Sequence, residues 1–212
     1  MITDSPLLVA RFPGLDYELS EPFPKFYLPD DRAFFEFCNA NSDSTLFFER
    51  EPDGEVRLTP PSGSETGRAN ATILGLLFVW NMQNGEPGYV FDAPTGFTLP
   101  SGAIRAPDVS YVAKARYDAL TEDEQAHHAP IAPDFVVEVM SPSDRLPKQQ
   151  DKMREYMTNG VRLGWLIHRK TRTVHTFRQG ADMETLADVA TVADPELPGF
   201  TLSTARVFPA ES

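Results

Sequence analysis

The feature that most constrains the fold is the apolar run Phe135-Val136-Val137-Glu138-Val139-Met140. An almost unbroken run of apolar and β-branched residues fits a central strand of a sheet that is covered on both faces. Glu138 is the exception within it, because a buried carboxylate is costly unless a cation or hydrogen-bond donors surround it. We therefore expect Glu138 to form a structural ion pair, with an arginine such as Arg162, or to belong to a functional site.

The remaining pattern predicts alternating helices and strands. Apolar residues at helical spacing predict helices over residues 31–39, 65–82 and 147–159. We predict strands at 45–50 and 55–58, joined by an Asp-Gly turn, a pair at 89–91 and 96–100, one at 106–112, and a pair at 164–168 and 173–177. Weaker strand signals follow at 185–192 and 200–202. This order is that of a mixed α/β (α+β) domain.

The chain of 212 residues divides into three parts by composition. The proline-rich residues 1–30 predict an extended arm, residues 31–180 a single domain, and residues 181–212 an extension packed on that domain. No apolar run is long enough to cross a bilayer, and the N-terminus lacks the pattern of a signal peptide, so we expect a cytoplasmic protein with no membrane partner. The single cysteine, Cys38, is expected to be buried and inert.

The formal net charge of −12 limits the classes of function. Proteins that bind nucleic acid non-specifically usually present a basic face to the phosphates, so the negative net charge argues against a simple nucleic-acid binder. The negative charge is more compatible with a metal-dependent nuclease, in which carboxylates bind a divalent cation and the cation then contacts the phosphate.

Two acids and a lysine are the candidates for chemistry. Asp108 and Glu138 lie on predicted neighbouring strands, where two carboxylates can share a divalent cation. Lys152 follows on the predicted helix beside its apolar stripe, from where it can reach inward. The alternatives are a turn-forming role for Asp108 and a solvated Lys152 paired with Glu155 or Asp151.

Other catalytic classes have less support. The sequence lacks a phosphate-binding glycine loop and a nucleophile-elbow serine. A glycosidase with a carboxylate pair would leave Lys152 without a purpose. The histidines do not have the spacing of a zinc site, and we expect them at the surface. They are His127, His128, His168 and His175.

Several sequence motifs together resemble one family. They are Arg105-Ala106-Pro107-Asp108-Val109-Ser110, residues 133–146 around Glu138, Lys152-Met153-Arg154-Glu155-Tyr156 and residues 159–167, with weaker agreement at 34–38, Glu49, 54–55, 66–70 and 91–97. This pattern closely resembles the Uma family of predicted restriction endonucleases, over roughly residues 30 to 180.

The resemblance implies a restriction-endonuclease-like core of the PD-(D/E)XK superfamily, with a mixed β-sheet flanked by helices. It implies that Asp108 is the first acid, Glu138 the second, and Lys152 a lysine that has moved to the helix, since Met140 occupies the usual lysine position. It also matches Glu65 and Asn70 to positions that contact substrate or metal-bound water.

The leading hypothesis is therefore an endonuclease acting on DNA, in which Asp108, Glu138 and the Val139 backbone carbonyl bind Mg²⁺ or Mn²⁺ and Lys152 activates water. A homodimer would supply one site for each strand. The alternative is a binding or regulatory module that keeps the nuclease fold without turnover, which the acidic composition favours.

Overall fold

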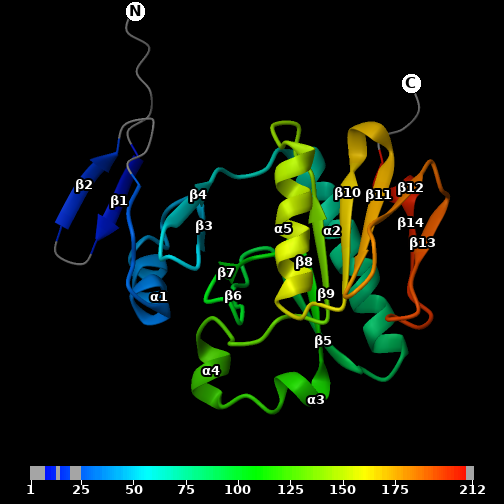
Figure 1. The fold of residues 1–212 in the computed structure, drawn as a ribbon, viewed down its shortest axis with the longest axis horizontal. Coiled ribbons are helices and arrows are strands. Elements are labelled where there is room, and N and C mark those ends of the chain that lie inside the picture. Colours follow the sequence, from blue (N-terminus) through cyan, green and yellow to red (C-terminus); the bar gives the residue numbers. More distant parts are fainter. Residues whose placement is uncertain (1–7, 13–14, 20–24, 209–212) are drawn as a thin grey trace, which may run out of the picture.

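A six-stranded mixed sheet forms the centre of the protein in the computed structural model, which describes residues 8–12, 15–19 and 25–208 (Figure 1). Its strands, in the order β12-β11-β10-β9-β8-β5, are β12 (Glu184–Ala187), β11 (Thr173–Arg178), β10 (Leu163–His168), β9 (Phe135–Val139), β8 (Val109–Ala113) and β5 (Gly88–Asp92). Strands β9 and β10 are parallel, whereas the other neighbours are antiparallel.

Strand β9 is covered on both faces, as its apolar run predicts. Phe135, Val137 and Val139 belong to the core that includes helix α2 (Ser64–Gln83). Val136 and Met140 belong to the core that includes helix α5 (Leu146–Thr158). Figure 1 shows α5 on one face of the sheet and α2 on the other. The predicted class, a mixed sheet flanked by helices, is confirmed.

A four-stranded sheet with the order β4-β3-β7-β6 lies apart from the central one. Its strands are β3 (Phe47–Arg50), β4 (Val56–Thr59), β6 (Phe97–Thr98) and β7 (Ile104–Arg105). Helix α1 (Asp31–Ala40) covers it through Phe34 and Phe37, which pack on Val56 and Ile104. Cys38 is half-buried at the edge of this core, and burial raises the pKa of its thiol to about 12.

One predicted strand pairing is wrong. Residues 89–91 do not pair with residues 96–100, because β5 pairs with β8 of the central sheet and β6 pairs with β7 of the smaller one. The two short segments do touch through side chains, since the Phe91 and Phe97 rings lie 5.3 Å apart, but their backbones form hydrogen bonds with different partner strands. Proximity in sequence was therefore a poor guide to strand pairing here.

The remaining elements lie at the two ends of the chain and in the connections. They are β1 (Leu8–Phe12), β2 (Leu15–Leu19), α3 (Lys114–Tyr117), α4 (Glu122–Ala126), η1 (Arg169–Thr171), β13 (Thr191–Ala193), β14 (Thr201–Ser203) and η2 (Thr204–Arg206). Of the arm expected over residues 1–30, the antiparallel β1–β2 hairpin and residues 25–30 are described, and the rest lies outside the described residues. None of the helices described is both long and apolar enough to span a bilayer.

His175 is buried, with 6% of its surface exposed, so its expected surface position is wrong. The reason is that β11 is an internal strand, since β12 pairs along its outer side. The sequence after Gly180 signals β12 only weakly, and the hairpin of β10 and β11 therefore looked like the edge of the sheet.

Gly88 is a sensitive packing position. A Cβ atom there would lie 2.3 Å from the Val112 carbonyl oxygen and 2.5 Å from the Tyr111 ring. We expect Gly88→Ala to lower the free energy of unfolding by about 2–3 kcal/mol, measured by urea denaturation, since the backbone at Val112 must move. Gly75→Ala is the control: it adds a methyl group in open space inside α2 and should stabilise by about 0.5–1 kcal/mol. Equal unfolding midpoints for the two variants would contradict the expectation.

Candidate active site

The register of two neighbouring strands brings the candidate acids together. Strands β8 and β9 pair antiparallel with Val109 opposite Val137. One step further along this register places Asp108 opposite Glu138. The charge of Asp108 is one of the causes that raise the pKa of Glu138, as expected for two carboxylates that face one another.

Asp108 is fixed by two hydrogen bonds. The Val139 backbone N–H donates to its Oδ2 at 2.7 Å, and the Asn70 side-chain amide donates to its Oδ1 at 2.7 Å. The Asn70 Oδ1 atom is buried and accepts no hydrogen bond from any residue that the structure describes. Helix α2 thus contributes Asn70 to the site, whereas the end of β9 contributes the main chain of Val139.

Glu138 is paired with Lys152, not with Arg162. The Lys152 ammonium lies 2.8 Å from Glu138 Oε1, and the buried Tyr156 hydroxyl donates to the same oxygen at 2.9 Å. Arg162 instead pairs with Glu196. Lys152 and Tyr156 lie one turn apart on α5, so this helix supplies both donors. Glu138 Oε2 accepts no hydrogen bond within the described part of the chain.

Burial sets the charge states of the acids. It raises the pKa of Asp108, and it raises the pKa of Glu138 to about 7 despite the nearby Lys152 ammonium. Burial disfavours charge on Lys152 too, but Glu138 and Glu49 more than offset it, and the pKa of Lys152 is raised well above its ordinary value. Lys152 is therefore a cation at neutral pH, whereas Glu138 binds its proton near neutrality.

Glu49 and Arg105 extend the site, and the sequence did not single them out for a role. Glu49 Oε1 lies 2.9 Å from the Lys152 ammonium and accepts the Ala106 backbone N–H at 3.1 Å. Arg105 is 4% exposed and pairs with Glu51 at 2.7 Å and Glu155 at 2.8 Å. No local pattern indicates these contacts, because they join β3, β7 and α5. Only the resemblance drew attention to Glu49.

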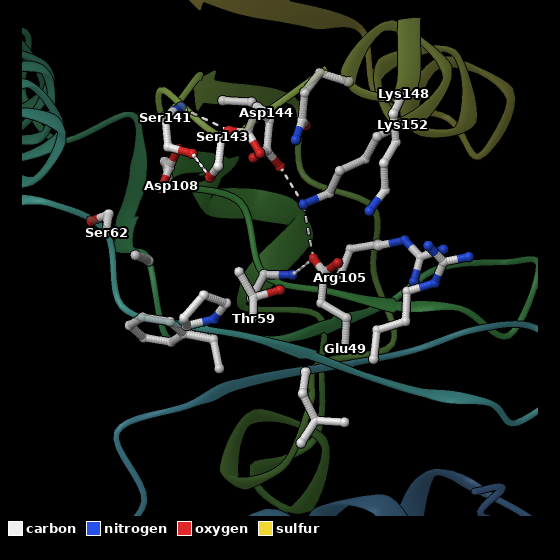
Figure 2. Close-up of a pocket in the computed structure, with 18 of the residues that line it drawn as sticks. Glu49, Thr59, Ser62, Arg105, Asp108, Ser141, Ser143, Asp144, Lys148 and Lys152 are labelled. Atoms are coloured by element: carbon white, nitrogen blue, oxygen red, sulfur yellow. Dashed lines mark hydrogen bonds and ion pairs between the residues drawn. The ribbon is translucent and has the colours of Figure 1, made fainter. Parts of the chain in front are cut away.

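These residues line an open groove of about 1280 Å³, into which Lys152 extends toward Glu49 (Figure 2). One wall is the β3–β4 hairpin with residues 60–63, and another is α5 with the Ser141–Asp144 turn. Its acidic lining residues are Glu49, Glu51, Glu55, Asp108, Glu138, Asp144, Asp151 and Glu155, and its basic ones are Lys25, Arg57, Arg105, Lys148 and Lys152. Acids therefore outnumber bases in the groove.

Glu65 is the expected site residue that the structure does not bring to the groove. Its side chain is 67% exposed and pairs with Arg68 at 3.1 Å and Arg169 at 3.0 Å. Glu65 lies in the first turn of α2, and neither of these arginines lines the groove. Asp108, Glu138, Lys152, Val139 and Asn70 all line the groove or contact a residue that does.

The oxygen atoms around Asp108 fit a hard divalent cation. Among the described residues no group of three or more His, Cys, Asp or Glu side chains is placed to hold one metal ion. Magnesium does not need such a group, since it keeps several waters and binds through one or two carboxylates and the substrate phosphates. Asp108, Glu138 with its free Oε2, and the orphaned Asn70 Oδ1 offer that kind of oxygen set.

Comparisons with known proteins agree on the family and the fold. A solved structure from Anabaena variabilis, titled as a "putative nuclease belonging to DUF820", superposes with a TM-score of 0.65 over 76% of this chain and 89% of that chain. Its 19% sequence identity makes it evidence for the fold alone. None of the curated proteins compared matches the chain. Residues 32–205 match the Uma2 family, described as "Putative restriction endonuclease", and the chain therefore belongs to that family.

Proposed function

We propose that this protein is a divalent-metal-dependent endonuclease that hydrolyses phosphodiester bonds in DNA. The observation that carries the proposal is the contact of the Lys152 ammonium, at 2.8 Å, with Glu138, whose strand neighbour is Asp108. Two acids and a lysine thus meet in one groove, from three different elements. The membership in a family described as restriction endonucleases supports the same reaction class.

Each residue has a proposed task. Asp108 and Glu138 would hold Mg²⁺ or Mn²⁺ together with the Val139 carbonyl, and Asn70 would orient Asp108 and offer its free Oδ1. The bound cation supplies Lewis acidity and a water of lowered pKa. Lys152 is already protonated, so it assists water activation by its charge, which stabilises both a hydroxide-like nucleophile and the crowded phosphate. Tyr156 fixes the orientation of Glu138.

The proposal also covers the domain organisation, the oligomeric state and the cellular compartment. Residues 31–180 form the nuclease domain, residues 1–30 an arm, and residues 181–212 an extension, whose Val192, Phe200 and Leu202 pack in the core on α2. A homodimer would bring one groove to each strand of a duplex. We place the protein and its DNA substrate in the cytoplasm.

Nicking of supercoiled plasmid under Mg²⁺ and Mn²⁺ titration tests the proposal. We expect conversion of supercoiled to open-circular DNA that requires the divalent ion and stops with a chelator, together with ion-dependent thermal stabilisation of the purified protein. A folded protein that binds neither ion and cleaves neither DNA nor RNA would remove the proposal.

The lining of the groove favours a second candidate function, a binding or regulatory module without turnover. Acidic side chains outnumber basic ones there, which weakens contact with a polyanion in the absence of divalent ions. Such a module predicts binding of a partner in this groove with no cleavage at any ion concentration. Electrophoresis of the plasmid after the same titration separates the two candidates.

The raised pKa of Glu138 predicts how ion affinity depends on pH. Because the ion displaces the proton of Glu138, affinity for Mn²⁺ should fall about tenfold per pH unit below pH 7 and level off above it. The metal-free protein should show the opposite sign: the folded pKa lies above the ordinary 4.5, so stability falls as pH rises from 4.5 to 7. Calorimetric titration and urea unfolding measure the two trends. An affinity in Glu138→Gln that varies with pH as in the wild type would assign the proton elsewhere.

A further inference from the structure

Lys152 is shared by carboxylates of two different sheets. Its ammonium lies 2.8 Å from Glu138 on β9 of the central sheet and 2.9 Å from Glu49 on β3 of the smaller sheet. We propose that Glu49 is a positioning residue, which keeps Lys152 in the groove when a divalent cation occupies Asp108 and Glu138. This inference rests on the proposed function, because it concerns the ion-bound site.

Glu49 is built to act as a fixed anion. Its side chain is 17% exposed, and its Oε1 accepts the Ala106 backbone N–H as well as Lys152. Burial alone would raise the pKa of Glu49, but the charges of Lys152 and Arg105 lower it, so the carboxylate stays ionised. Arg105 is itself held by Glu51 and Glu155. Glu49 therefore keeps its charge and its place whether or not an ion is present.

Lys152 needs a second anion such as Glu49 because of the electrostatics at Glu138. In the metal-free protein Glu138 and Glu49 attract Lys152 together. A divalent cation bound at Glu138 would neutralise the negative charge of that carboxylate and would repel the Lys152 ammonium beside it. Among the described residues, Glu49 is then the other anion in contact with Lys152. Without Glu49, Lys152 would either compete with the ion or turn toward the open groove.

Chemical labelling of Lys152 measures how well Glu49 holds its ammonium, without any measurement of DNA cleavage. The purified protein is treated with an amine-acetylating reagent with and without saturating Mg²⁺, and acetylation at Lys152 is quantified by peptide mass spectrometry. In the wild type we expect slow labelling in both states. In Glu49→Gln, which keeps an acceptor for the Ala106 N–H, we expect Mg²⁺ to raise the labelling rate of Lys152 severalfold, because an ammonium that turns toward the open groove is more accessible to the reagent.

Matched controls come from the same groove. Glu51→Gln removes one negative charge from an acid that contacts Arg57 and Arg105 but not Lys152, and its labelling should match that of the wild type. Lys148, exposed on the same helix, serves as an internal standard that labels fast in every variant. Glu49→Asp keeps the anion one methylene further back and should give a smaller rise than Glu49→Gln.

Parallel calorimetric titration with Mg²⁺ separates the possible failures. If Mg²⁺ binds the wild type and Glu49→Gln but leaves Lys152 equally protected in both, Glu49 is not the anchor. If the substitution abolishes ion binding, Glu49 is a ligand and the positioning role is wrong. If even the wild type binds no ion, the proposed function fails, and the anchoring inference fails with it.

Discussion

Asp108→Asn is expected to lower metal-dependent plasmid nicking by at least about 10³-fold while the protein stays folded. The substitution removes one of two acids that would hold the cation. The asparagine oxygen can still accept the Val139 N–H, and its NH₂ group can donate to the Asn70 Oδ1 atom once the Asn70 amide flips. Burial already raises the pKa of Asp108, so loss of its charge should leave the metal-free stability unchanged or higher. Nicking rates and thermal unfolding with and without Mg²⁺ measure both effects.

Asp151→Asn is the matched control for this substitution. Asp151 also lines the groove, but it is 75% exposed and pairs only with Arg154 within the described residues. Its replacement should leave nicking within about twofold, since exposed pairs of this kind contribute little. Wild-type nicking by Asp108→Asn, or an equal loss in Asp151→Asn, would show that Asp108 has no special place in the reaction.

Lys152→Met is expected to lower the rate of plasmid nicking by about 10³-fold or more, while the affinity for the divalent ion stays the same or rises. The variant removes the cation that would stabilise the reacting phosphate, and it also removes the positive charge that competes with a metal ion for Glu138. Without an ion, Glu49 and Glu138 lose their shared partner, so the metal-free protein should be destabilised by about 3–5 kcal/mol. Mg²⁺ should therefore raise the melting temperature of this variant more than that of the wild type.

Two further variants sharpen the Lys152 experiment. Lys148→Met removes an exposed lysine of the same groove wall and should retain most of the nicking. Lys152→Arg keeps the charge in a planar, bulkier group and should recover only part of the activity. Loss of both nicking and ion binding in Lys152→Met, with the fold intact, would contradict a role confined to the reacting phosphate.

The fold was predictable where one segment carries its own pattern. The apolar run around Val137 identified a buried central strand, and the helical spacing identified α2 and α5 to within one or two residues at each end. The pairing of β5 with β8 was not predictable in this way, because the preference of a strand for its partner depends on packing between distant segments. For the same reason the sequence did not reveal the pairing of β12 with β11, and hence the burial of His175.

The site was predictable in part, for a related reason. Glu138 stood out because its strand is otherwise apolar. Asp108 and Lys152 were candidates from their places on a neighbouring strand and on the following helix, and the resemblance to the family gave them their roles. Contacts between elements that are distant in the sequence leave no local pattern by which they could be predicted. Glu49 follows two phenylalanines in a short strand and looks like any polar strand residue. Tyr156 looks like a core aromatic, and only the structure shows that its hydroxyl donates to Glu138.

The ladder between β8 and β9 determines where the chain tolerates a change of length. Asp108 and Glu138 face each other through the pairing of Val109 with Val137, and the connection between the two strands, residues 114–134, does not line the groove. We expect insertions in its exposed part, residues 118–127, to leave the two acids in place, whereas residues 129–134 are largely buried. A single residue added within β8 between Asp108 and the paired residues would turn the carboxylate to the opposite face of the sheet. New segments are therefore most easily acquired in residues 118–127, whereas the number of residues between each acid and the paired residues of its strand cannot change.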